Sequence, residues 1–168
     1  MNYAQHFQHA DDVIEHLTPL VARERNPLLE ARYTGFLAVA AVTTYELAIK
    51  SIFISFANSK HKVLGSFTES HFNRINGKIK LRIVKDEYVL RFGRQYLDRF
   101  NKKLDESRKR YYADKNMDIV SAYGNLVVWR NDFAHEGRIR ANSTFLETAQ
   151  SYNAGKEVIR CLAESMRR

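Results

Sequence analysis

The chain has 168 residues, which is about the size of one domain and is long enough to bury a hydrophobic core. Apolar residues make up 45% of it and charged residues 27%, so disorder is excluded as the default state. The single cysteine, Cys161, excludes a disulfide framework and a cysteine-based zinc site. Seven glycines and two prolines are too few for the turns of a β-sandwich or barrel, so an intracellular, mostly helical domain is expected.

Helical spacing of apolar residues predicts an all-α protein. A loop is expected over 59–66 and an irregular segment over 111–115, and Asn76 and Gly77 are expected to close a short helix. The predicted architecture is an antiparallel helical bundle that forms a single domain over residues 1–168. Two short helices, at about 67–76 and 82–92, are inserted between the long ones. The predicted helices cover about 3–21, 27–58, 67–76, 82–92, 94–110, 117–134 and 144–166.

Residues with capping preferences mark the starts of three of these helices. Asn26 followed by Pro27 is typical of an N-cap and a first helical residue. Asn116 is a candidate cap for the next-to-last helix. Thr144 and Glu147 have the spacing of a capping box, which would open the final helix.

Residues 35–57 are the one stretch apolar enough to suggest a membrane helix. Glu46 and Lys50 lie in the middle of it, and a charge at the bilayer centre costs about 2.5 kcal/mol or more. No secretory signal is expected at the first residues either. The sequence therefore predicts a central, buried helix in a soluble cytoplasmic protein with no membrane partner.

The net charge of +8 comes from one part of the sequence. Residues 74–115 contain 14 basic and 6 acidic residues, whereas the rest of the chain is neutral in sum. A basic surface with aromatic residues between the cations is typical of nucleic-acid binding, and a solvated helix face with core aromatics is the alternative. The candidate RNA-binding residues are Lys102, Lys103, Arg108, Lys109 and Arg110.

The segment with the clearest chemical content is Val127–Arg138, near the end of a predicted helix. Histidine transfers protons near neutral pH, and a guanidinium group neutralises the charge that builds up on a phosphorus atom under attack. Arg130 and His135 would therefore suit cleavage of RNA, in which the ribose 2′-hydroxyl is the nucleophile. Five residues apart, they lie about 140° apart around an ideal helix, but local unwinding before Gly137 could bring them together.

This segment resembles the signature of the HEPN superfamily, an arginine followed by a polar residue and by a histidine near a helix end. Arg130-Asn131-Asp132-Phe133-Ala134-His135 matches it, and nearly the whole chain is similar to the prokaryotic stand-alone branch that includes the RiboL-PSP type and a second, related type. The resemblance implies a metal-independent endoribonuclease of toxin–antitoxin or phage-defence systems, with Arg130 and His135 as catalytic residues and Asn131 in support. It also implies a homodimer with one shared cleft, and an antitoxin or defence-system partner.

Three alternatives remain open at this stage. The protein could be a non-catalytic HEPN module that binds RNA or a partner protein, or an assembly domain in which Arg130 and His135 only pack. Glu46 could point at the cleft or could form an ion pair with Lys50. Trp129 and Phe133 could anchor a dimer interface or belong to the core.

His9 and His16 lack further ligands, so neither a metal site nor a cofactor is expected.

Overall fold

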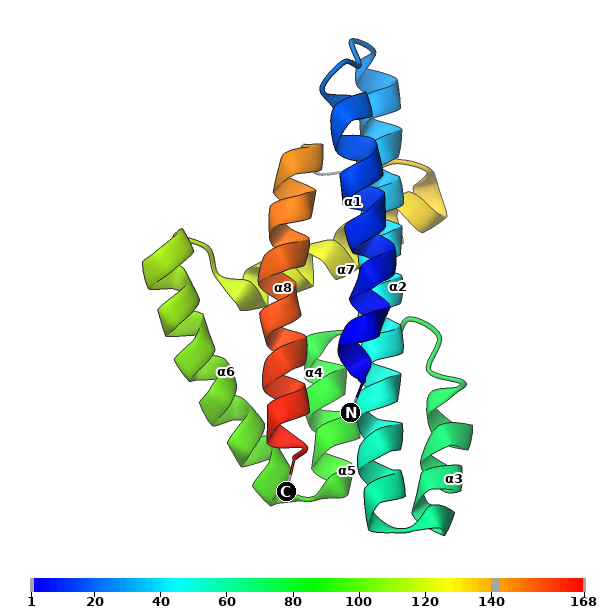
Figure 1. Ribbon diagram of the computed structural model, residues 1–168, viewed down its shortest axis with the longest axis vertical. Coiled ribbons are helices and arrows are strands. Elements are labelled where there is room, and N and C mark those ends of the chain that lie inside the picture. The colour runs from blue at the N-terminus through cyan, green and yellow to red at the C-terminus, as the bar shows by residue number, and fades with distance from the viewer. Residues whose placement is uncertain (1, 140–142, 168) are drawn as a thin grey trace.

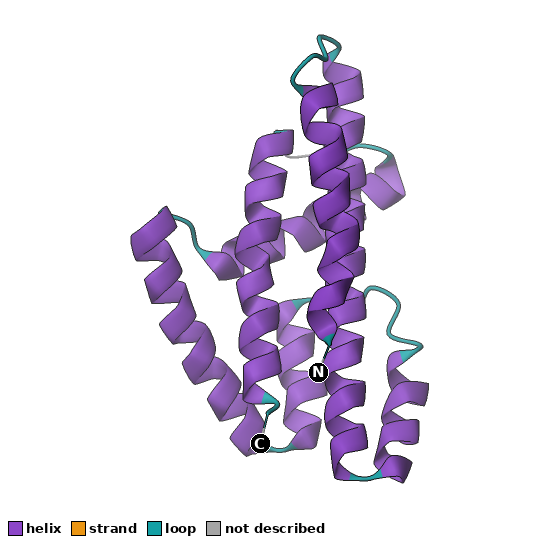
Figure 2. Cartoon of the chain, viewed as in Figure 1, coloured by secondary structure: helices purple, strands orange, loops and turns teal. Residues whose placement is uncertain are grey.

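The computed structural model describes residues 2–139 and 143–167, and these form helices joined by short loops with no strand (Figure 2). The all-α prediction is confirmed. Figure 1 shows the helices. In chain order they are η1 (Tyr3–Phe7), α1 (Gln8–Val21), α2 (Pro27–Lys60), α3 (Lys62–Phe72), α4 (Leu81–Ile83), η2 (Val84–Val89), α5 (Leu90–Phe92), α6 (Arg94–Lys115), α7 (Ile119–Glu136) and α8 (Phe145–Ser165).

Helix α2 is the centre of the bundle, and α1, α3, α7 and α8 pack against it. Tyr45, Ile49 and Phe53 of α2 are fully buried, because apolar residues occupy nearly all sides of the helix. By length and composition alone α2 could cross a membrane, but 61% of its most apolar part is buried by the other helices. The predicted central helix is therefore confirmed.

Three tyrosines join α2, α7 and α8. The ring of Tyr45 stacks between those of Tyr123 and Tyr152, with centroids 5.3 and 5.7 Å away. The Tyr45 hydroxyl donates a hydrogen bond of 2.5 Å to the backbone oxygen of Tyr152, beside Gly155, where a Cβ would lie 2.3 Å from that hydroxyl. Burial raises the pKa of Tyr45, so the hydroxyl remains a donor.

Several predicted boundaries are confirmed. The side chain of Asn26 accepts a hydrogen bond from the N–H of Leu28 at the start of α2. Thr144 and Glu147 form the expected capping box of α8. The insertion between the long helices α2 and α6 consists of α3 and of a second segment, residues 81–92, whose middle turn is a π-helix.

Four boundary predictions are wrong. Helix α3 ends at Phe72, so Asn76 and Gly77 lie in the loop after it and do not close it. Residues 59–66 form no loop, because α3 begins at Lys62, where the side chain of His61 accepts from the N–H of Val63. Residues 111–115 are the last turn of α6, which ends at Asn116 in the left-handed conformation. Asn116 is therefore the C-cap of α6, and α7 is capped by Asp118 instead.

Candidate functional site

Arg130 projects from α7 onto the loop that links α3 to α4, residues 73–80, which we call the basic loop. The guanidinium group lies against Gly77 so closely that a Cβ there would be 2.7 Å from Nη2 and 3.0 Å from Nη1. Asn76 and Gly77 both have positive φ, 38° and 78°, so the chain turns sharply at this point. Only a glycine fits this backbone conformation and leaves room for the arginine.

The basic loop is held by hydrogen bonds from three other elements. The N–H of Gly77 donates to Oε2 of Glu46 on α2 at 2.7 Å. The hydroxyls of Tyr88 on η2 and Tyr123 on α7 donate to the backbone oxygens of Lys78 and Ile79, at 2.9 and 2.6 Å. Burial raises the pKa of both tyrosines, so both hydroxyls remain protonated donors. Arg130 therefore lies against a fixed surface.

Glu46 has two partners in this arrangement. Its Oε1 atom forms an ion pair of 2.8 Å with Nζ of Lys50, one helical turn along α2, while Oε2 accepts from Gly77. The two alternatives for Glu46 are therefore combined: it pairs with Lys50 and it also reaches the site of Arg130. Both side chains are largely buried, which strengthens the pair relative to an exposed one.

Arg130 lies against a loop that carries three basic residues, and Glu46, which also reaches this loop, is paired with Lys50. Nη1 of Arg130 donates to Oδ1 of Asn131 at 3.0 Å, and in the described part of the chain no carboxylate forms an ion pair with this arginine. Arg74, Lys78 and Lys80 of the basic loop are exposed and likewise form no ion pair among residues 2–139 and 143–167. A guanidinium group that keeps its charge beside further cations is suited to bind a phosphate group.

His135 lies in the last turn of α7, where its side chain is exposed. The helix continues through Glu136 and ends at Gly137, whose φ of 69° is typical of a helix C-terminus. The expected local unwinding does not occur, because this glycine provides the turn one residue beyond the helix. Among the described residues, no hydrogen bond joins His135 to Arg130. One protomer therefore presents the two side chains on different faces of α7.

Trp129 is buried and Phe133 is half-buried within the protomer. Trp129 is buried in the main core. The ring of Phe133 packs on Gly35 of α2 so closely that a Cβ at Gly35 would lie 2.0 Å from it. Of the two predicted uses of these aromatic residues, the structure supports core packing.

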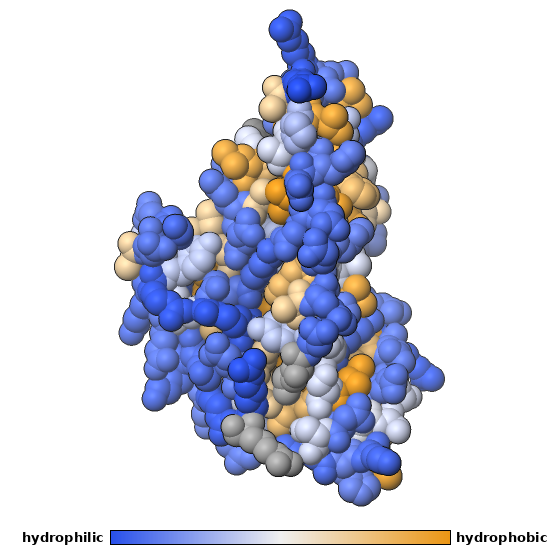
Figure 3. All heavy atoms as spheres, in the orientation of Figure 1, coloured by the Kyte–Doolittle hydropathy of each residue, from blue (hydrophilic) through white to orange (hydrophobic). Residues whose placement is uncertain are grey.

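The five candidate RNA-binding residues lie on α6, on the far side of the bundle from the C-terminal end of α7 (Figure 1). The side of the molecule that α6 forms is mostly hydrophilic (Figure 3). Arg108 forms an ion pair with Asp118, and Lys103 and Arg110 pair with Glu164 and Glu157 of α8 at 3.0 and 3.7 Å. Lys102 and Lys109 are exposed and form no such pair with described residues. The structure thus brings Arg130, Asn131 and Glu46 together but leaves α6 apart from them.

Metal-binding side chains do not cluster in the described part of the chain: no three histidine, cysteine, aspartate or glutamate residues there could hold one ion. Sequence analysis placed Arg74, Lys78 and Lys80 in the basic window, residues 74–115, but missed Gly77 as a candidate site residue. The Asn76-Gly77 pair within a basic run was a signal for it, but it was interpreted only as the end of a helix.

The helical bundle and the arginine motif on α7 place the chain in the class of HEPN domains. A family model described as RiboL-PSP-HEPN matches residues 5–167, which is nearly the whole chain. The protein therefore belongs to the RiboL-PSP-HEPN family, as the motif predicted. No curated protein and no solved structure matches it. Membership in this family indicates a function connected with RNA cleavage or nucleotide binding.

Proposed function

We propose that the protein is a metal-independent endoribonuclease that cleaves RNA with Arg130 and His135. The observation that carries the proposal is the guanidinium of Arg130, which is held between Asn131 and the basic loop and forms no ion pair with a described residue. Arg130 and the cations of the basic loop favour a phosphate diester, and they favour even more the additional negative charge of the transition state. Glu46 is the positioning residue of this site, since it holds Gly77.

The proposed reaction uses the 2′-hydroxyl of the substrate as nucleophile. Its oxygen bonds to phosphorus while its proton passes to one His135, and the bond from phosphorus to the 5′ oxygen breaks as that oxygen takes a proton from a second His135. Arg130 binds the phosphate oxygens, and Asn131 orients the guanidinium group. The products are a 2′,3′-cyclic phosphate and a 5′-hydroxyl.

The second histidine comes from a homodimer in this proposal. His135 shares the exposed face of α7 with Val128, seven residues earlier and about 20° from it around an ideal helix. Phe36 and Leu47, eleven residues apart on α2, are exposed in the same way. A two-fold axis near these residues would place both copies of His135 in one cleft, because such an interface uses the same patch twice. Light scattering on a dilution series identifies the concentration at which the protein is a monomer. A monomer that cleaves RNA at an undiminished rate would contradict the shared cleft.

A non-catalytic module that binds RNA or a partner protein is the second candidate. The separation of His135 from Arg130 within one protomer favours it, because binding needs only the cationic surface. Lys102 and Lys109 on α6 are outlying contacts to the RNA backbone in either case. A cytoplasmic toxin–antitoxin or phage-defence system, with an antitoxin or another defence protein as partner, is the proposed setting.

Incubation of total RNA with the wild type and with His135→Ala in EDTA, followed by mapping of the ends, tests the proposed function. We expect cleavage by the wild type only, with 2′,3′-cyclic phosphate and 5′-hydroxyl ends. A requirement for Mg²⁺ or the formation of 5′-phosphate ends would contradict the proposed mechanism. RNA binding without cleavage would favour the non-catalytic module.

A further inference from the structure

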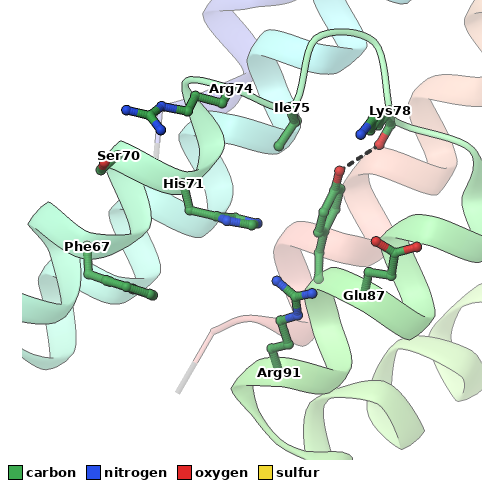
Figure 4. A pocket seen from close by; sticks show the side chains of 9 residues that line it. Phe67, Ser70, His71, Arg74, Ile75, Lys78, Glu87 and Arg91 are labelled. Carbon is green, nitrogen blue, oxygen red and sulfur yellow. Dashed lines mark hydrogen bonds between the residues drawn. The ribbon is translucent and has the colours of Figure 1, made fainter.

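A groove separates α3 from the segment formed by η2 and α5. It consists of two adjoining cavities of about 300 and 140 Å³, which have five lining residues in common. Figure 4 shows Phe67 and His71 projecting from α3 on one side and Glu87 and Arg91 from the facing segment on the other. The larger cavity is at the lower end of the roughly 300–1,000 Å³ range of small-molecule sites, which suits a ligand of about one nucleotide.

One wall of the groove is aromatic. Phe67 is 72% exposed although it is a large apolar residue, so one face of its ring is available to a planar partner. His71 lies one turn further along α3, and its Nε2 atom is buried without a hydrogen-bond partner among the described residues. A buried polar atom usually has a partner, and an aromatic surface with such an atom beside it matches the face and edge of a nucleobase.

The rest of the lining of the larger cavity includes three cations. Arg91 faces the aromatic wall, Arg74 lies at the rim, and Lys78 closes the upper end (Figure 4). None of the three forms an ion pair within the described part of the chain, and Glu87 is the one carboxylate among the residues that line the larger cavity. A ligand that is planar at one end and anionic at the other has the chemistry of a nucleotide.

The groove and the site of Arg130 share the basic loop. Lys78 lines the groove, and the preceding residue, Gly77, lies against the guanidinium of Arg130. We propose that this groove is a subsite that binds one nucleotide of the RNA strand next to the phosphate held by Arg130. Phe67 stacks on the base, and Arg91 and Lys78 contact the adjoining phosphate. The inference rests on the proposed function and adds a substrate-positioning surface to it.

Binding of an uncleavable strand tests the subsite without any need for catalysis. The probe is a short 2′-O-methyl oligouridine with one 2-aminopurine, whose fluorescence falls when the base stacks. We expect the wild type to quench it, and Phe67→Ala to weaken binding about tenfold and abolish the quenching. Val63→Ala is the matched control, since Val63 is 70% exposed on the same helix but does not line the groove, and it should behave as the wild type does.

A second variant tests the cationic side. Arg91→Gln should lower the slope of log K against log salt by about 0.7, which is the contribution of one single-strand phosphate contact. Arg25→Gln, with the same change of charge at the start of α2, should leave the slope unchanged. AMP should compete only weakly, because it lacks the neighbouring nucleotides.

The outcomes separate this proposal from the proposed function. If the wild type cleaves RNA but Phe67→Ala and Val63→Ala bind and quench alike, the subsite is refuted and the nuclease remains. If AMP binds as tightly as the strand does, the groove is a site for free nucleotides and the RNA subsite is refuted. If Phe67→Ala loses the quenching while the wild type and Val63→Ala retain it, the subsite is supported, whether or not the wild type cleaves RNA.

Discussion

The basic loop and helix α6 come from the same cationic stretch of sequence, but the fold treats them differently. Five of the eight basic residues of α6 form ion pairs, three of them with carboxylates from α8 or the start of α7. The cations of the basic loop form no ion pairs with described residues, and the loop carries Gly77, against which Arg130 lies.

This difference shows that charge counted along a sequence is a poor measure of charge offered to a ligand. The carboxylates of Glu157 and Glu164 are 47 and 61 residues along the chain from the cations that they neutralise, Arg110 and Lys103, so no local count includes them. An exposed ion pair adds little to stability, but it reduces the attraction of its cation for a phosphate. The basic loop is therefore the better candidate for the RNA site.

The largest effect is expected at Arg130. Arg130→Ala removes the guanidinium group that contacts both Asn131 and the basic loop, and the cleavage rate should fall about 10²–10³-fold, as it does when one stabilising donor is lost from a transition state. The Tm should change little, because no carboxylate pairs with this arginine in the described structure. Arg108→Ala, on α6, is the control and should retain most of the activity. Equal losses of cleavage activity in the two variants would show that the site of Arg130 is no more important for cleavage than α6 is.

A smaller loss of activity is expected when the surface beneath Arg130 changes. In Gly77→Ala the new Cβ would lie 2.7 Å from Nη2 of Arg130, and the positive φ adds about 1–2 kcal/mol of strain. We expect a lower cleavage rate together with a lower Tm. Glu46→Ala removes the acceptor of the Gly77 N–H and should change the rate in the same direction.

Gly93→Ala is the control for Gly77→Ala, because it should lower the stability of the fold without lowering the cleavage rate. Gly93 has a φ of 133°, but a Cβ there would lie 3.6 Å from its nearest neighbour, Tyr96, and away from Arg130. This variant should lose about 1–3 kcal/mol of stability and retain its cleavage rate at a temperature where it is folded. A rate that follows the Tm in both glycine variants would show that Gly77 has only a structural role.

Two triple variants with the same change of net charge compare the regions by salt dependence. Replacing Arg74, Lys78 and Lys80 with glutamine should reduce the slope of log K against log salt by about 2, at about 0.7 for each phosphate contact. Replacing Arg108, Lys109 and Arg110 should reduce it by about 0.7 or less, because of these three only Lys109 forms no ion pair with a described residue. Titration of RNA binding by fluorescence anisotropy measures both slopes. A larger reduction in the α6 variant would mean that α6, and not the basic loop, makes most of the phosphate contacts.

The smallest effect concerns the ion pair between Arg108 of α6 and Asp118 at the start of α7, and its contribution to stability. Burial raises the pKa of Asp118, but hydrogen bonds from the backbone of Ser121 and Val120 and the guanidinium of Arg108 outweigh it, so the pKa is lowered overall. A lowered pKa means that the ionised carboxylate stabilises the fold above its ordinary pKa of 3.8, and that this contribution is lost as the pH falls below that value. Asp118→Asn should therefore be less stable than the wild type at pH 7, with a difference that shrinks on acidification.

The partner of Asp118 gives the matching comparison. Arg108→Gln should lower the stability at pH 7 by about 0.2–1 kcal/mol, which is typical of an exposed ion pair. Lys109→Gln, at the next position, should leave the Tm unchanged. Thermal unfolding followed by circular dichroism measures these differences, and equal effects of the two variants would argue against a structural role for Arg108.

Local signals in the sequence predicted most of the fold. The cap at Asn26 and the capping box of Thr144 and Glu147 depend on residues within one turn, so they could be identified without the tertiary structure. The loop predicted over 59–66 failed because His61 alone separates two helices there. Asn116 failed as an N-cap because it ends α6 in the left-handed conformation, which asparagine also favours.

The candidate site was predictable only in part. The motif identified Arg130, Asn131 and His135, and it placed the chain in its family. The contact of Arg130 with Gly77 could not be predicted, since it joins residues more than 50 positions apart through the packing of α7 beside the basic loop. The ion pairs of α6 were missed for the same reason, because their carboxylates lie on another helix.

The position of the bound RNA tests the central claim most directly. A 2′-O-methyl strand that contains 4-thiouridine is bound to the wild-type protein and crosslinked with light, and the modified peptides are identified by mass spectrometry. The account predicts crosslinks to residues 63–91 and to the end of α7 around Arg130. Crosslinks confined to the outer face of α6, between Arg99 and Lys115, would contradict it.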